Sequence, residues 1–111
     1  EEAKHASANG AEIVAPTLYG YTQETAHIEG ADFRMVAEMC RELQEEACVM
    51  MEGHIYSPED AMKCIFIGCH SVVVGSAITR PHYVTKRFVD CLGKYQNNWR
   101  DAERAKTFEM N

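Results

Sequence analysis

The chain of 111 residues lacks a long hydrophobic run, an excess of positive charge and a glycine-rich nucleotide motif. No apolar run approaches the ~18 residues of a membrane-spanning helix, so we expect no membrane partner. Lys and Arg number 11 against 17 Asp and Glu, which gives a net charge of −6. Nucleic-acid backbones require clustered cations, so we expect no nucleic-acid partner either. The absence of a Gly-x-Gly-x-x-Gly or Walker motif argues against a nucleotide cofactor.

The sequence also lacks the cysteine spacing of a disulfide framework or of a zinc site. The five cysteines are an odd number, and their spacing fits no disulfide framework. The segment Cys64-x4-Cys69-His70 lacks the close pairs of a zinc motif. We therefore expect no metal, and free, mostly buried thiols in a reducing cytoplasm. The first residue is Glu1 rather than methionine, so we expect these residues to be cut from a longer protein.

Helical and strand patterns alternate along the chain. Asp32 is a suitable N-cap for a helix to about residue 45, and Ser57-Pro58 begins another that Gly68 ends. The latter helix is expected to bury Ala61, Cys64, Ile65 and Ile67. The remaining predictions are a helix over 1–9, strands over 12–17, 47–51 and 71–74, a last helix from about 79 and a polar tail over 97–111.

This alternation predicts an α/β fold with a parallel sheet and right-handed crossovers. Two of the three strands have no polar alternation, which predicts burial on both faces. Three parallel strands alone would leave two apolar edges open. Residues 1–111 are therefore predicted to form a single segment, without an internal domain boundary, of a larger barrel.

The residues that indicate a catalytic or binding site lie at the ends of two predicted strands. The run Ser71–Val74 is followed by Gly75-Ser76, where backbone N–H groups could hold a phosphate. The preceding strand ends in Glu52-Gly53, which places a carboxylate beside that turn. The pattern indicates an acid–base site for a phosphorylated small molecule. The alternatives are a plain turn at Gly75-Ser76, and a Glu52 that caps a neighbouring backbone or pairs with a lysine.

Four segments resemble the C-terminal part of the N-acetylmannosamine-6-phosphate 2-epimerase family. They are Leu18-Tyr19-Gly20-Tyr21-Thr22, Met51-Glu52-Gly53, Pro58-Glu59-Asp60-Ala61 and 70–81, which contains VVVGSAITRP. The resemblance runs from residue 1 to about residue 92. It implies the last three β/α units of a cytoplasmic TIM (β/α)8 barrel, with no cofactor. It also implies an isomerase of sialic acid and amino-sugar catabolism, which converts N-acetylmannosamine 6-phosphate to N-acetylglucosamine 6-phosphate by inverting C2.

The resemblance also assigns roles to individual residues. Glu52 is similar to the catalytic glutamate of the family. A phosphate-binding group and a sugar-bordering group follow by position: Gly53, His54, Gly75, Ser76 and Arg80 for the phosphate, and Thr17, Gly20, Tyr21 and Thr22 for the sugar.

The chain also departs from the family pattern. His54 stands where the family has Arg or Lys, and it either replaces that cation or faces water. Tyr19 replaces a small residue, and Ala15-Pro16 stands where small or hydroxylated residues are usual. The resemblance places the catalytic lysine in the N-terminal half of the barrel, which these residues do not include.

The sequence therefore leaves three functional hypotheses. The first is a fragment of the 2-epimerase, with a phosphosugar as its substrate. The second is another phosphate-binding barrel enzyme, because a barrel fold does not determine the reaction. The third is a non-catalytic remnant that binds a phosphosugar or a partner protein. The expected protein partner is an identical chain in a homodimer or a complementing N-terminal barrel half.

Overall fold

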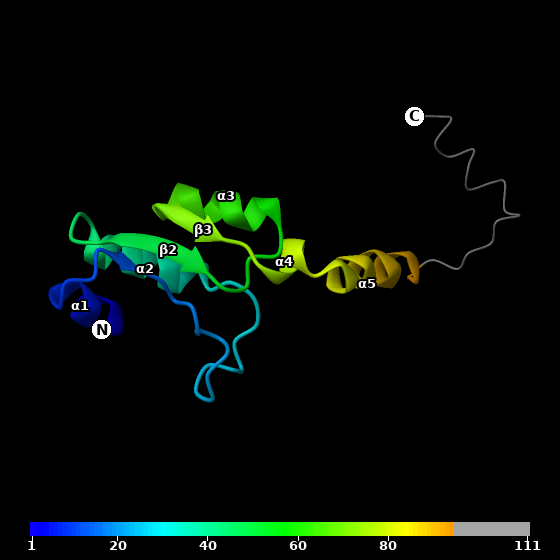
Figure 1. Cartoon of the computed structure of the whole chain (residues 1–111), viewed down its shortest axis with the longest axis horizontal. Coiled ribbons are helices and arrows are strands. Elements are labelled where there is room, and N and C mark those ends of the chain that lie inside the picture. The colour runs from blue at the N-terminus through cyan, green and yellow to red at the C-terminus, as the bar shows by residue number, and fades with distance from the viewer. Residues whose placement is uncertain (95–111) are drawn as a thin grey trace, which may run out of the picture. The chain divides into compact units, whose positions relative to one another are not determined.

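The computed structural model describes residues 1–94, and the predicted polar tail over 97–111 lies outside them. The chain divides into a first unit, Glu1–Arg80, and a second unit that begins at Pro81. The first unit alternates helices and strands as the sequence predicts (Figure 1). Its elements are α1 (Glu2–Ala8), β1 (Ile13–Val14), α2 (Phe33–Leu43), β2 (Cys48–Glu52), α3 (Pro58–Ile67), β3 (Ser71–Val73) and α4 (Ser76–Thr79).

The second unit contains α5 (Pro81–Leu92). Lys86 and Asp90, one helical turn apart, form an ion pair of 2.9 Å on it. The sequence predicts one helix after β3, and the residues described up to 94 form two. The short α4 lies between β3 and α5, and Arg80 is its C-cap. Because proline has no N–H and disfavours helical geometry in the preceding residue, Pro81 favours a break at this point.

The helix ends follow the predicted capping residues. The carboxylate of Asp32 accepts a hydrogen bond from the Met35 N–H at 3.0 Å, and the Ser57 hydroxyl accepts one from the Asp60 N–H at 3.2 Å. Gly68 ends α3 with φ of +129°, a conformation that favours glycine. β1 is shorter than predicted and stops at Val14, just before Ala15-Pro16, since proline cannot donate to a strand ladder.

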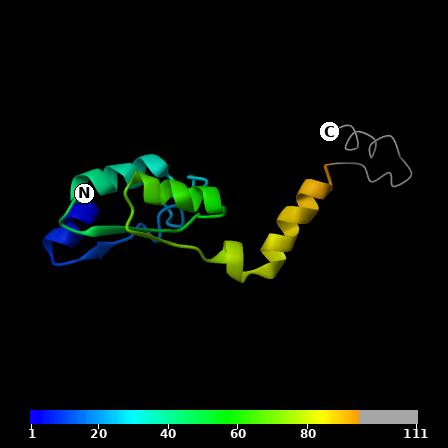
Figure 2. The same ribbon diagram turned by 90° about the horizontal axis from the view of Figure 1, so that it is seen from above.

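The three strands form a parallel sheet in the order β1-β2-β3. In its register Val14 pairs with Val49, and Met51 pairs with Val72. Figure 2 shows α2 and α3 over the same side of these strands. The core lies between them, where Val36, Leu43, Val49, Met51 and Cys64 are each no more than 3% exposed.

The opposite face of the sheet is open. Ile13 pairs with Cys48, and Glu52 pairs with Val73, so these residues point to the side away from α2 and α3. Ile13 is 55% exposed, Val73 is 38% exposed, and Cys48 is exposed. The prediction of burial on both faces is therefore wrong for residues 1–94, because the described helices cover only one face.

Burial on α3 and among the cysteines also differs in part from the predictions. Cys64 is fully buried and Ala61 and Ile67 pack against the core, but Ile65 is 49% exposed because it lies about 100° around the helix from Cys64. All five cysteines are free as predicted, yet only Cys64 and Cys69 are buried. The prediction that most thiols are buried is therefore wrong.

Candidate functional site

A cavity of about 210 Å³ lies at the carboxyl ends of the three strands. Its walls come from the segment after β1, from the end of β2 and the loop that follows it, and from the turn between β3 and α4. Seven of the ten predicted site residues line it, namely Thr17, Tyr21, Glu52, Gly53, His54, Gly75 and Ser76. Residues up to 59 positions apart in the sequence, Thr17 and Ser76, therefore meet at one edge of the sheet.

Glu52 is the last residue of β2 and is half-buried. The hydroxyl of Thr17 donates a hydrogen bond of 2.8 Å to its Oε2. This contact joins the segment after β1 to the end of β2 and holds one carboxylate oxygen in place. A carboxylate oriented at a strand end, beside a cavity, can accept or return a proton from a bound molecule.

His54 lies in the same cavity, packed into the loop after β1. Its ring stacks on Tyr21, with 4.4 Å between the centroids and 9° between the planes, and meets the edge of Tyr56 at 6.2 Å. The Nε2 atom is buried without a hydrogen-bond partner in the described chain. His54 as a whole is half-buried, so a contact with phosphate and exposure to water both stay predictions.

The predicted phosphate turn is at the start of α4. Gly75 is the N-cap of this helix, and its carbonyl accepts hydrogen bonds from the N–H groups of Ile78 and Thr79 at 2.9 and 3.0 Å. The first N–H groups of a helix have no intrahelical acceptor, so in α4 those of Ser76 and Ala77, which precede Ile78, are the ones that could face an anion. Gly75 and Ser76 are both exposed and line the cavity, but Arg80 is not among its lining residues.

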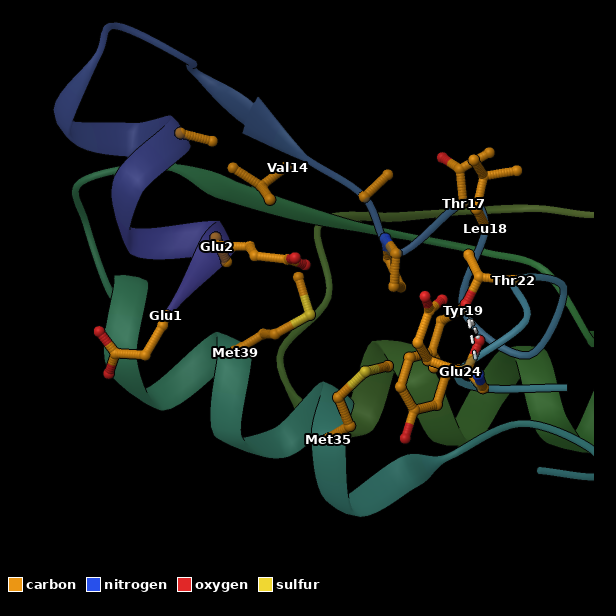
Figure 3. Close-up of a pocket in the computed structure, with 15 residues that line it drawn as sticks. Glu1, Glu2, Val14, Thr17, Leu18, Tyr19, Thr22, Glu24, Met35 and Met39 are labelled. Atoms are coloured by element: carbon orange, nitrogen blue, oxygen red, sulfur yellow. Dashed lines mark hydrogen bonds between the residues drawn. The ribbon is translucent and has the colours of Figure 1, made fainter. Parts of the chain in front are cut away.

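A second, larger cavity of about 720 Å³ lies between α1, the segment after β1 and α2. Figure 3 shows Met35 and Met39 projecting from α2, with Val14 on the opposite wall. Thr17 lines both cavities, and Thr22 lines only the larger one. We assign the site to the smaller cavity, because it lies at the carboxyl ends of the strands and gathers Glu52 with two glycine turns, whereas the larger cavity lies between α1, the loop after β1 and α2.

The remaining two predicted sugar-bordering residues help to build the loop after β1. The hydroxyls of Thr22 and Thr25 are 2.7 Å apart, and the Gly20 N–H donates to Thr25 Oγ1 at 2.8 Å. Tyr19 donates its hydroxyl to Asp32 at 2.9 Å, which ties this loop to the start of α2. This hydrogen bond raises the pKa of Tyr19, while the Met35 N–H and then the Tyr19 hydroxyl lower the pKa of Asp32.

Three lining residues were missed by the sequence analysis, namely Ile55, Tyr56 and Val73. Val73 reaches the site through the strand register, which pairs it with Glu52 on the open face and is not contained in the sequence pattern. Ile55 and Tyr56 carry no motif, and only the path of the loop after β2 brings them to the cavity.

Among residues 1–94, no three His, Cys, Asp or Glu side chains are grouped so that they could hold a metal ion. Within the same range, the helices are too short or too polar to cross a bilayer.

Parallel strands in chain order, helices over one face and candidate site residues at the carboxyl ends are typical of part of a TIM (β/α)8 barrel. The solved N-acetylmannosamine-6-phosphate 2-epimerase from Clostridium perfringens has the same arrangement, with a TM-score of 0.74 at 38% identity. The match covers 82% of this chain and 39% of that protein.

The family model described as "Putative N-acetylmannosamine-6-phosphate epimerase" matches residues 1–94, and the chain belongs to this family. Two curated relatives carry the name "Putative N-acetylmannosamine-6-phosphate 2-epimerase". The one from Caldanaerobacter subterraneus is 39% identical over 89 residues, which are 80% of this chain and 37% of the relative. The one from Clostridioides difficile is 41% identical over 92 residues, which are 83% of this chain and 40% of the relative. The chain thus spans about 40% of the length of these relatives.

Proposed function

We propose that this chain supplies the Glu52-bearing part of the active site of an N-acetylmannosamine-6-phosphate 2-epimerase. The observation that carries the proposal is the half-buried Glu52, oriented by Thr17 at the edge where the three strands end. Membership of the epimerase family supports the choice of reaction. The resemblance to that family supports a place in cytoplasmic amino-sugar and sialic acid catabolism.

The reaction needs a proton to leave C2 from one face of the sugar and another to return on the opposite face. Thr17 engages Oε2 of Glu52, so Oε1 is the oxygen that we assign to proton transfer. Proton exchange on two faces needs a second group. We assign that role to a lysine from the part of the barrel that lies outside these residues, as the resemblance implies.

The phosphate is assigned to the glycine turns beside Glu52. Gly53 has φ of +101°, and a Cβ there would lie 3.5 Å from the Thr17 carbonyl, so the backbone passes close to the loop after β1. Gly75 and Ser76 present the start of α4 to the same cavity. A short helix after the last barrel strand is a frequent phosphate site in this fold. Arg80 is the cationic candidate for the phosphate. Thr17 and Tyr21 line the cavity, and Gly20 and Thr22 belong to the loop that carries them.

The open face of the sheet supports a complementing barrel portion as the partner. Ile13, Cys48 and Val73 are exposed there, on the side of the sheet that the remaining strands face in a closed barrel. We therefore propose that further β/α units cover this face, and that a homodimer forms through a different surface.

The test is a complementation assay. The 111-residue chain is incubated with N-acetylmannosamine 6-phosphate in D2O, alone and with the N-terminal barrel half of a family member, and deuterium at C2 is followed by NMR. We expect epimerisation and deuterium incorporation only in the mixture. The N-terminal half alone is the control. A folded mixed barrel that binds the phosphosugar without deuterium incorporation would instead indicate a non-catalytic binding protein.

A further inference from the structure

His54 occupies an unusual position in the backbone. It follows Gly53, and both residues are in the left-handed region, with φ of +101° for Gly53 and +60° for His54. Non-glycine residues adopt this conformation rarely, and such residues concentrate at functional sites. The chain bends at Gly53, directly after Glu52, and the His54 side chain contacts the loop after β1.

The His54 ring fills a space that the loop after β1 leaves for it. One ring face stacks on Tyr21 at 4.4 Å. Beside it, a methyl group at Gly20 would collide with Nε2 of His54, closer than real Cβ atoms come. Gly20 also has φ of +88°, so the turn needs glycine for its conformation as well as for space. The Tyr21 ring in turn lies 3.6 Å from the position that a Cβ atom would take if it were added at Gly53.

The loop held in this way carries Thr17, whose hydroxyl orients Glu52. We infer that His54 is a positioning residue, whose ring clamps the loop after β1 against the end of β2 and so keeps Thr17 on the Glu52 carboxylate. This inference rests on the proposed function only for its effect on turnover. The clamp itself is a property of the fold and can be measured without substrate.

The first test measures amide hydrogen exchange in the 111-residue chain. In His54→Ala, the amides of Gly20 and Tyr21 should exchange about ten-fold faster, because local opening of the loop becomes easier. The amides of Val49 and Met51 in β2 should stay protected, which shows that the fold persists. His54→Phe should retain the slow exchange, because the ring still stacks on Tyr21. The control is His27→Ala, which removes an exposed imidazole from the same loop.

The second test uses the mixed barrel of the complementation assay. In His54→Ala, kcat should fall about ten-fold while KM changes less, since the carboxylate is misplaced rather than a substrate contact removed. A large rise in KM at unchanged kcat would instead identify His54 as a phosphate ligand and overturn the inference. Unchanged exchange at Gly20 and Tyr21 in His54→Ala, or equally fast exchange in His54→Phe, would overturn it even if the barrel has no epimerase activity.

Discussion

At the scale of single residues, the site depends on how Glu52 is held. A carboxylate at the end of a strand is common, but one that accepts a hydrogen bond from Thr17, 35 positions earlier, is oriented by tertiary structure. The two residues do different work in the proposed reaction. Glu52 exchanges the proton, and Thr17 keeps the carboxylate at the angle that this exchange requires.

Glu52→Gln removes the proton acceptor and changes the side-chain volume little. We expect kcat for epimerisation in the mixed barrel to fall by about 10²–10⁴-fold, the usual contribution of a general base. Glu38→Gln, on the exposed side of α2, is the matched control and should have full activity. Steady-state kinetics give both values, and a Glu52→Gln barrel with unchanged kcat would show that another group takes the proton.

At the scale of elements, the start of α2 joins a helix cap to the site loop. The Asp32 carboxylate accepts hydrogen bonds from the Met35 N–H and the Tyr19 hydroxyl. These bonds, that of Met35 first, hold the pKa of Asp32 below its ordinary value. A carboxyl group with a lowered pKa in the folded state contributes stability above its unfolded pKa of about 3.9. That contribution is lost as the pH falls through the folded value.

Asp32→Ala should therefore lower the free energy of unfolding by about 1 kcal/mol at pH 7, the usual cost of losing an N-cap. The difference from the unsubstituted chain should shrink as the pH falls below the unfolded pKa of about 3.9 toward the lowered folded pKa of Asp32. Ser57→Ala removes an uncharged N-cap from α3 and is the control, with a similar cost at both pH values. Urea unfolding at pH 7 and pH 3 measures how much each of the two substitutions lowers the free energy of unfolding at each pH. An Asp32→Ala cost that does not change with pH would contradict the assignment.

At the scale of the whole molecule, α2 and α3 cover one face of the sheet, and the described residues leave the other face open. Val49 and Met51 lie under α2 and α3, while Cys48 lies on the open side. Burial raises the pKa of Cys64, and burial together with the neighbouring Cys40 raises the pKa of Cys69 to about 12. Because the thiolate is the reactive form, these two thiols should react slowly.

Cys48 therefore reports on whether further barrel units dock on the open face. In a Cys91→Ser background, a thiol reagent at pH 8 should label Cys48 of the chain alone faster than Cys64 or Cys69. Adding the N-terminal barrel half should slow the labelling of Cys48 by about ten-fold or more, because a closed barrel buries its inward-facing residues. Mass spectrometry of the labelled peptides gives each rate. Labelling of Cys48 that does not slow in an active mixture would exclude this face as the docking surface.

The helix ends and strand ends of this structure can be predicted from the sequence. Asp32, Ser57-Pro58 and Gly68 mark helix ends that the structure confirms, because caps act within a few residues of themselves. The sequence also places Glu52 and Gly75 at strand ends. An apolar or β-branched run predicts a strand, and the strand is expected to end where a carboxylate or a glycine follows.

The remainder was decided by packing between distant segments. The Thr17 hydrogen bond to Glu52, the Tyr21 stack on His54 and the exposure of Cys48 all depend on strand register and on the path of the loop after β1. No pattern within ten or twenty residues contains that information, because register aligns residues that are far apart in the chain. The sequence by itself determined the α/β order, the helix caps and the acid at the end of β2. The tertiary structure alone decided which side chains that acid meets, because those contacts exist only once the strands lie side by side.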